Sequence, residues 1–221
     1  MTSRAIPIFP LPLVLFPGAT LPLHIFEARY RRMLADCLEN DRQFGVVYLP
    51  SGQDETGIEA GSVGTIGRIE SVVPLPTGRS NIVVAGTTRF SFGDFTDSEA
   101  PYHVARITAY SDEDEDPIPL NELVRQVHVQ FARVSKAARV LASDASEPPT
   151  LPDDSALLAF FIASLIDLDA AARQKLLIVR SPSSRLGTIR DLLSGAVEPL
   201  EQLAMVHSVA KQNGHGPRVV Q

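Results

Sequence analysis

The chain has 221 residues, of which 44% are hydrophobic and 21% charged, and its formal net charge at pH 7 is -6. This length allows one large domain or two small ones with a real core, and the charged fraction argues against wholesale disorder. An acidic chain lacks the basic face typical of nucleic-acid binding, so no nucleic acid is expected as a partner. Cys37 is the only cysteine, which excludes intramolecular disulfides and Cys-based zinc sites and fits a reducing cytoplasm.

The apolar segment 6–26 follows Arg4 and has to be weighed as a signal peptide. Five prolines interrupt it, and proline removes helix hydrogen bonds, so a signal peptide is not expected. The apolar run 156–166 has eleven residues, whereas a membrane-spanning helix needs about 20. We therefore expect a soluble, cytoplasmic protein without a membrane partner.

Up to residue 112 the chain consists of short β-type runs separated by glycine and proline. Alternating or continuous apolar patterns predict strands over 44–49, 62–73, 81–85 and 102–107. Gly78 lies between two of these runs and predicts a hairpin turn with a positive φ angle. One helix is predicted within this region, over 27–38, because its apolar residues recur at helical spacing.

The acidic run 111–117 is the strongest candidate for a domain boundary. Its carboxylates repel one another and Pro117 ends it, which is typical of a solvated linker. Calcium is the alternative ligand for such a run, but the central glycine and terminal glutamate of an EF-hand loop are missing. The sequence predicts a β-rich subdomain over 1–112 and a linker over 113–116.

After the linker the apolar residues recur every three or four positions, which predicts helices. One helix is expected over 120–141, and an apolar, buried one over 156–166. Asp169 is expected to cap a short helix that reaches Ile178, and Ser181-Pro182 has the signature of a further helix start. A last helical segment is expected over 197–210. These elements predict a helical bundle over 117–213, followed by a flexible tail over 214–221.

Motifs for known catalytic and cofactor chemistry are missing from the chain. A phosphate-binding loop needs a lysine directly after a glycine, and none of Lys136, Lys175 and Lys211 meets that condition. The five histidines and the carboxylates form no recognisable ligand set, so neither a metal nor a cofactor is expected. Cys37 lies on the apolar stripe of its helix, where a buried and inert thiol is the default. An unrecognised thiol or hydrolase site remains the alternative.

Large apolar side chains in a proline-rich frame are the most conspicuous feature of the N-terminal region. One interpretation is a strand and loop that seal the core. The other is an exposed apolar groove that binds polypeptide, because such patches commonly mark protein interaction sites. Both interpretations can hold for different residues. The candidate polypeptide-binding residues are Phe9, Phe16, Phe26, Tyr30 and Tyr48.

The segment PLPLVLFPGATLPLHIFEARY, residues 10–30, strongly resembles the start of the Lon protease N-terminal domain, the LON substrate-binding family. The resemblance continues through further segments and covers about residues 5–195; these segments are 41–47, 63–70, 78–90, 168–177 and 182–186. It implies an α+β fold in which a PUA-like β pseudo-barrel with one helix is followed by an all-helical bundle. The ATPase and Ser–Lys peptidase modules of the full protease have no counterpart here, so we expect a stand-alone bacterial Lon-domain protein.

The resemblance also implies a function, which is recognition of unfolded or damaged polypeptide in protein quality control or proteolysis. We expect a non-enzymatic adaptor or holdase, with an ATPase or protease supplied in trans as a second expected partner. PUA-like folds in other families bind RNA, which makes a weak RNA-binding module a further alternative. The net charge disfavours it, although Arg29, Arg32 and Arg42 could form a local basic face.

Overall fold

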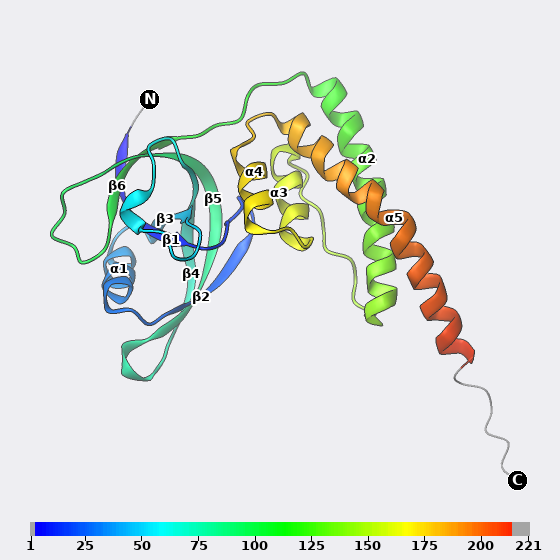
Figure 1. Ribbon diagram of the computed structural model, residues 1–221, viewed down its shortest axis with the longest axis horizontal. Coiled ribbons are helices and arrows are strands. Elements are labelled where there is room, and N and C mark those ends of the chain that lie inside the picture. The colour runs from blue at the N-terminus through cyan, green and yellow to red at the C-terminus, as the bar shows by residue number, and fades with distance from the viewer. Residues whose placement is uncertain (1–2, 214–221) are drawn as a thin grey trace, which may run out of the picture. The chain divides into compact units, whose positions relative to one another are not determined.

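The computed structural model describes residues 3–213, and the expected tail over 214–221 lies outside the described residues. The chain forms two compact units (Figure 1). The first, here called the barrel unit, comprises the residues up to Glu113 together with Ala163–Arg180. The second, the helical unit, comprises Asp114–Ile162 and the residues from Ser181 onward. None of the described helices is both long enough and apolar enough to cross a membrane.

The barrel unit contains six strands in one mixed sheet, ordered β2-β5-β4-β3-β1-β6. An additional pairing of β5 with β6 closes five of them into a ring, β5-β4-β3-β1-β6. β5 closes the ring because it pairs with β4 and its second half also pairs with β6, whereas its first half carries β2 outside the ring (Figure 1). The strands are β1 Arg4–Leu11, β2 Thr20–Ile25, β3 Gln43–Tyr48, β4 Val63–Pro74, β5 Ser80–Phe95 and β6 Val104–Ala109.

β1 is a regular strand inside this ring, although its prolines argue against a central strand in the sequence. The structure accommodates Pro7 and Pro10 because β1 changes partner between them. Residues 4–7 pair with β6 in antiparallel orientation, and residues 8–11 pair with β3 in parallel orientation. Each proline therefore lies where the strand has a paired neighbour on only one side, which is where a missing N–H is tolerated.

Helix α1, Ala28–Glu39, covers one end of the barrel and contributes Tyr30, Met33 and Leu34 to the main core cluster. A polar network fixes the loop after β3 to this helix. Glu55 accepts two hydrogen bonds from the Arg29 guanidinium, at 2.7 and 2.8 Å, and one from the Tyr30 hydroxyl at 3.2 Å. The loop carrying Glu55 is thus held in place by charge-assisted bonds.

The barrel unit also includes helix α4, Ala170–Ile178, which the sequence assigns to a single helical bundle. Asp169 caps this helix as expected, since its side chain accepts from the Ala172 N–H. Arg89 on β5 is 6% exposed and donates to the carbonyls of Leu177 and Val179 at 2.6 and 2.8 Å. The buried guanidinium joins the barrel to the C-terminal end of α4, which explains why 163–180 belong with the strands.

The helical unit is built on α2, Pro117–Ala142, and α5, Pro182–Asn213. These two helices run in the same direction (Figure 1). Three hydrogen bonds along the pair each join residues that are 68 positions apart in the sequence, which fixes how the two helices are aligned. Helix α3, Ser155–Leu165, packs in this unit as far as Ile162. Arg185 of α5 is fully buried beside it, with its guanidinium 4.4 Å from the Phe160 ring. The helix expected to start at Ser181-Pro182 and the segment expected over 197–210 form one continuous helix, α5.

The acidic run 111–117 is largely exposed, and some of its residues also make specific contacts. Asp112 pairs with Arg89, Glu115 accepts from the Ser183 N–H at 3.0 Å, and Asp116 caps α2. Pro117 is the first residue of α2, a position where its missing N–H leaves no helix hydrogen bond unmade. The fold is α+β as predicted, and the two units separate between Glu113 and Asp114 at this point of the chain.

Candidate functional site

The five aromatic residues predicted to bind polypeptide do not lie together on the surface. Phe9, Phe16 and Tyr30 are 6%, 1% and 4% exposed, which places them in the core. Phe9 packs on the Tyr30 ring with 4.1 Å between centroids. Tyr48 is half-buried at the end of β3, and Phe26 alone is well exposed, at 59%.

The prediction of an exposed groove that includes Phe9, Phe16 and Tyr30 is therefore wrong. Phe9 and Tyr30 belong to the main core cluster of the barrel unit, and Phe16, in the loop between β1 and β2, is buried as well. The alternative interpretation, a strand and loop that seal the core, describes them. The exposed Phe26 directs attention to strand β2, which precedes it.

β2 forms an exposed three-stranded arm with the first half of β5 and the end of β4. Residues directly opposite one another in antiparallel strands point to the same side of the sheet. The register pairs Pro22 with Val83 and Ser71, and His24 with Asn81 and Val73, so these side chains share one side. We call this side, together with Phe26, the β2 face; its members are Pro22, His24, Phe26, Ser71, Val73, Asn81 and Val83.

The centre of the β2 face is organised by His24. Its Nδ1 atom lies 2.8 Å from the Asn81 Oδ1 atom on the neighbouring strand, and its ring stacks on Phe26 with 5.9 Å between centroids. These contacts orient the Phe26 ring while leaving it accessible. Val73, two strands away, is 56% exposed. The face thus presents apolar groups on both sides of a small polar centre.

The opposite side of the same arm is buried in the barrel. Ile25, Ile82 and Val84 belong to the main core cluster, and Leu21 and Leu23 pack against it. Alternation along β2 therefore sends one set of side chains into the core and the other to the β2 face. The core anchors the arm, so the exposed set has a fixed geometry.

β2 is also an edge strand, because β5 is its only partner among the described strands. The Gly86 N–H donates to the Ala19 carbonyl at 2.8 Å, and alternation from there directs the backbone groups of Pro22 toward the open edge. Pro22 has no N–H, so this edge lacks one donor that an added strand would need. Recognition through side chains on the face is favoured over addition of a strand.

Alternation could have revealed part of this face in the sequence. Thr20, Pro22 and His24 alternate with apolar residues of β2, and Ser71 and Val73 do the same at the end of β4. Because of the prolines, no strand was predicted at β2. Without the pairing of β2 with β5, the residues of the shared face could not be grouped together. Val73 was missed for this reason.

The thiol of Cys37 does not suit nucleophilic chemistry. The side chain is 3% exposed, and burial, with the nearby Asp41 and Asp36 charges, raises the pKa of the thiol to about 12. Its Sγ donates to the Gln43 carbonyl at 3.2 Å. A protonated, buried thiol is neither a nucleophile nor a metal ligand. Across residues 3–211, no three His, Cys, Asp or Glu side chains form a group that could hold a metal ion.

The arginines considered as a basic face for RNA are engaged within the barrel unit. Arg29 pairs with Glu55 and Glu27, and Arg32 pairs with Asp36 at 3.0 Å. Arg42 donates to the Ile69 carbonyl at 3.2 Å. Carboxylates next to two of the three guanidinium groups reduce the local positive potential that phosphate binding needs.

Comparisons with known proteins agree on one family. The model of the ATP-dependent protease La (LON) substrate-binding domain matches residues 5–195. The chain is 28% identical over 204 residues to Lon protease 2 of Herpetosiphon aurantiacus, covering 90% of this chain and 25% of that protein. It is 25% identical over 202 residues to Lon protease of Brucella suis, again covering 90% and 25%. The chain thus spans about a quarter of the length of these relatives.

Solved structures give the same result for the fold. The Lon N-terminal domain protein from Xanthomonas campestris superimposes with a TM-score of 0.58 at 25% identity, over 84% of this chain and 96% of that one. The N-terminal domain of Mycobacterium avium complex Lon protease gives a TM-score of 0.64 at 17% identity, over 86% and 98%. The second similarity is one of fold.

Proposed function

Because the chain belongs to the LON substrate-binding domain family, we propose that it recognises unfolded or damaged polypeptides through the β2 face, without catalysing a reaction. The ligand is an extended segment whose apolar side chains contact Phe26, Pro22 and Val73. Unfolded chains expose such side chains and folded ones bury them, so an apolar face distinguishes the two states.

The observation that carries this proposal is where the exposed apolar residues lie. Among residues 3–112, the large apolar side chains classed as exposed are Phe26 and Val73, and both belong to the β2 face. Covering a phenylalanine side chain contributes about 1.5–3 kcal/mol. A face this small supports weak, transient binding that tolerates many sequences, as expected of a module that meets varied clients.

The proposal also includes a role in protein quality control or proteolysis. The chain acts as an adaptor that passes clients to an ATPase or protease in trans, or as a holdase that keeps them soluble. The buried, protonated Cys37 supports a binding role over a thiol enzyme. Co-purification of the chain and a Phe26→Asp variant from native lysate separates the two roles: a specific ATPase or protease indicates an adaptor, and a broad set of unfolded proteins a holdase.

Binding of a permanently unfolded model protein, measured by fluorescence anisotropy, tests the proposal directly. Phe26→Asp and Val73→Asp each place a charge on the face and should weaken binding about tenfold, which corresponds to about 1.4 kcal/mol. Ile118→Asp is the matched control, since Ile118 is 78% exposed on α2 and the carboxylate is favoured in the first turn of that helix. Binding that is equal for the folded and unfolded forms, or unchanged in both face variants, would refute the proposal.

A further inference from the structure

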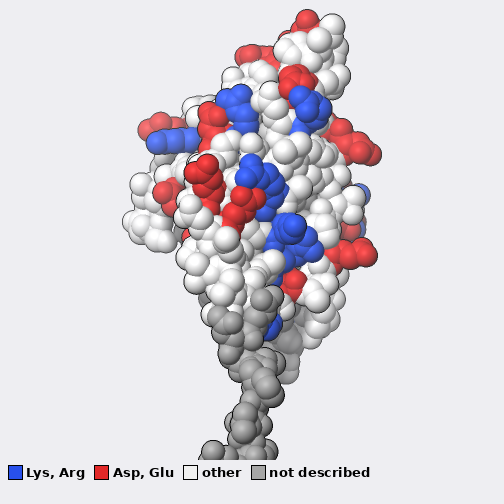
Figure 2. Space-filling view, turned by 90° about the vertical axis from the view of Figure 1, so that its right-hand side faces the viewer, with Lys and Arg blue, Asp and Glu red and all other residues white. Residues whose placement is uncertain are grey.

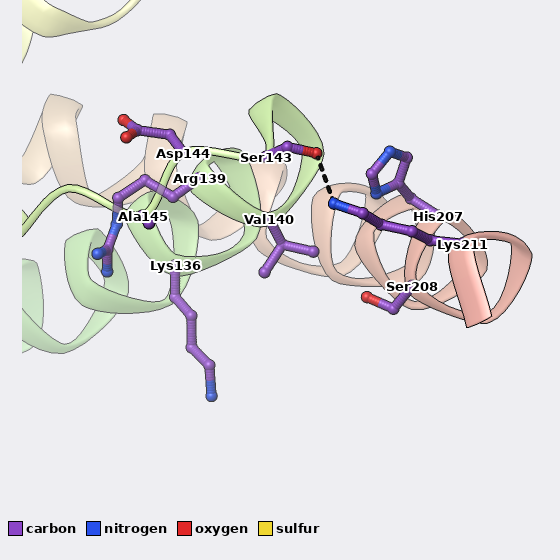
Figure 3. A pocket seen from close by; sticks show the side chains of 9 residues that line it. All are labelled: Lys136, Arg139, Val140, Ser143, Asp144, Ala145, His207, Ser208 and Lys211. Carbon is purple, nitrogen blue, oxygen red and sulfur yellow. Dashed lines mark hydrogen bonds between the residues drawn. The ribbon is translucent and has the colours of Figure 1, made fainter. Parts of the chain in front are cut away.

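A groove follows one side of the α2–α5 pair, along the C-terminal halves of the two helices. Two adjoining cavities of about 400 and 220 Å³ form it, and they share Lys136, Val140 and Ser208. Figure 3 shows Val140 between the two helices, with Lys136 extending from α2 and Ser208 from α5. The groove belongs entirely to the helical unit, so its geometry does not depend on the barrel unit.

The lining residues follow a helix-pairing pattern on both sides. On α2, Arg133, Lys136 and Val140 are separated by three and four positions, and Val129, 51% exposed, lies four positions earlier. On α5, Glu201, Met205 and Ser208 are separated by four and three positions. This spacing is the one by which a helix presents a continuous seam to a neighbouring helix.

The floor of the groove is apolar; its two alanines are nearly buried, and the more exposed apolar surface lies at its border. Val140, Ala137 and Ala204 form the floor, and Met205 stands at its border with 64% of its surface exposed. Methionine is flexible and adapts to differently shaped partners, which makes it frequent at surfaces that bind helices. Val209, 50% exposed, follows Met205 by one helical turn and prolongs the apolar border.

The rim of the groove is basic in a chain that is acidic as a whole. Its ionisable lining residues are four lysines and arginines, two carboxylates and His207. The carboxylates are already engaged: Glu201 accepts from Arg133 at 2.7 Å, and Asp144 accepts from the Ser146 N–H at 2.9 Å. The basic residues are Arg133, Lys136, Arg139 and Lys211, which include two of the three lysines of the chain.

Basic residues are favoured at the C-terminal ends of helices because of the helix dipole, but this explains only some of the basic residues of the rim. Arg139 donates to the Ser146 carbonyl, which follows the end of α2. Lys211, in the last turn of α5, donates to the Ser143 hydroxyl at 3.3 Å (Figure 3). Lys136 lies more than one turn before the end of α2, beyond the range of the dipole. Lys136 is exposed, and Glu201, the carboxylate that it influences electrostatically, is itself paired with Arg133. The Lys136 ammonium is therefore available to a ligand.

We propose that this groove binds an amphipathic helix of a partner protein, with apolar residues on the Val140–Met205 floor and acidic residues against Lys136, Arg139 and Lys211. Helix-in-groove recognition uses this combination of an apolar floor and a charged border. An anionic membrane is the less favoured occupant, because a concave site suits a helix better than a planar surface. Figure 2 shows acidic side chains beside the basic ones on the side that it presents, which also disfavours a membrane.

Two synthetic helices of about 18 residues test the proposal on the full chain, since shorter peptides are marginal as isolated helices. Both carry leucine on one face, and the border positions are glutamate in one and lysine in the other. We expect the glutamate peptide to bind at least tenfold more tightly at low salt, and this preference to shrink as salt is raised. Amide chemical-shift changes should concentrate at Ala137, Val140, Ala204 and Met205.

Variants of the chain connect the binding to the groove. Lys136→Glu combined with Lys211→Glu should weaken binding of the glutamate peptide about tenfold, and Met205→Asp should weaken binding of both peptides. Lys175→Glu is the matched control, because it changes the remaining lysine, which is exposed on α4 outside this groove. Equal affinity for the two peptides, or no effect of the groove variants, would overturn the proposal.

Two further results would assign the groove to another occupant and also overturn it. One is a dimer of the chain in solution that Met205→Asp converts to a monomer. The other is binding to vesicles of anionic phospholipid that depends on Lys136 and Lys211. Neither result affects binding of unfolded protein to the β2 face, so the two proposals fail separately.

Discussion

The barrel unit and the helical unit differ in how far they bury their large apolar residues. The barrel unit folds most of its aromatic residues inward; its exposed large apolar residues are scattered, with Phe26 and Val73 on the strands' side and Leu165 and Ile178 within 163–180. In the helical unit, four such residues are exposed within the seven positions from Leu203 to Val209 alone. A closed ring of strands encloses one volume, whereas a pair of helices buries only the side on which they meet. The first unit therefore offers a small, rigid face and the second a long, open one.

The largest expected effect comes from a charge placed at a fully buried position. Phe16→Asp replaces a side chain that is 1% exposed, so it both creates a cavity and buries a carboxylate. We expect a loss of at least about 5 kcal/mol in the free energy of unfolding, enough to unfold a typical domain. Circular dichroism and urea denaturation measure it. The same substitution at Phe26 should change stability by about 0.5 kcal/mol or less, and similar losses at both positions would mean that Phe26 is covered in the folded protein.

The next effect concerns the buried guanidinium that joins α4 to the barrel. Arg89→Met keeps much of the side-chain volume but removes the bonds to the Leu177 and Val179 carbonyls and leaves Asp112 without this cation. Breaking such a buried pair costs about 3–5 kcal/mol. Hydrogen exchange of the α4 amides should accelerate first. Arg125→Met, which breaks an exposed pair with Glu122 on α2, should cost about 0.5 kcal/mol or less.

A third effect appears at alkaline pH and tests how tightly the barrel excludes water. The folded Cys37 thiol has a pKa of about 12, above the roughly 8.5 of an unfolded chain. The folded protein thus holds this proton while the unfolded chain loses it, so stability falls as pH rises from about 8.5 toward 12. At pH 10 the loss should approach about 2 kcal/mol.

A comparison with Cys37→Ala isolates this contribution, because the variant keeps every other titrating group. Urea midpoints at pH 7.5 and pH 10 should differ more in the unmodified protein than in the variant. The mutation also creates a cavity, which lowers the free energy of unfolding by the same amount at both pH values. This contribution therefore cancels when the two pH values are compared. Identical pH dependence in the two proteins would show that the thiol is not protected in the folded state.

The smallest expected effect belongs to the open face of the helical unit. Val206→Glu changes a residue that is 67% exposed on α5, so stability should change by about 0.5 kcal/mol or less. Thermal unfolding of the variant and the unmodified chain measures the difference. A large destabilisation would mean that Val206 is covered in solution, and the open character of this unit would then be wrong.

Local sequence signals predicted much of the secondary structure. The Asp169 cap, the positive φ of Gly78 and the helix of residues 28–39 follow from residue type and spacing, and each is present in the structure. The prediction failed for β1 and β2, because their prolines are tolerated only where a neighbouring strand is missing. Strand pairing is a long-range property, so no local pattern could reveal it.

The sequence by itself determined the α+β composition, the change of character near residue 112 and the resemblance that the family model bears out over residues 5–195. Only the tertiary structure decided which aromatic residues are accessible, since Phe9 and Phe26 look alike in the sequence but are 6% and 59% exposed. It also decided that 163–180 pack with the strands and that α2 and α5 run in the same direction. The physical reason is that periodicity shows which side chains share a face, whereas covering that face depends on distant segments.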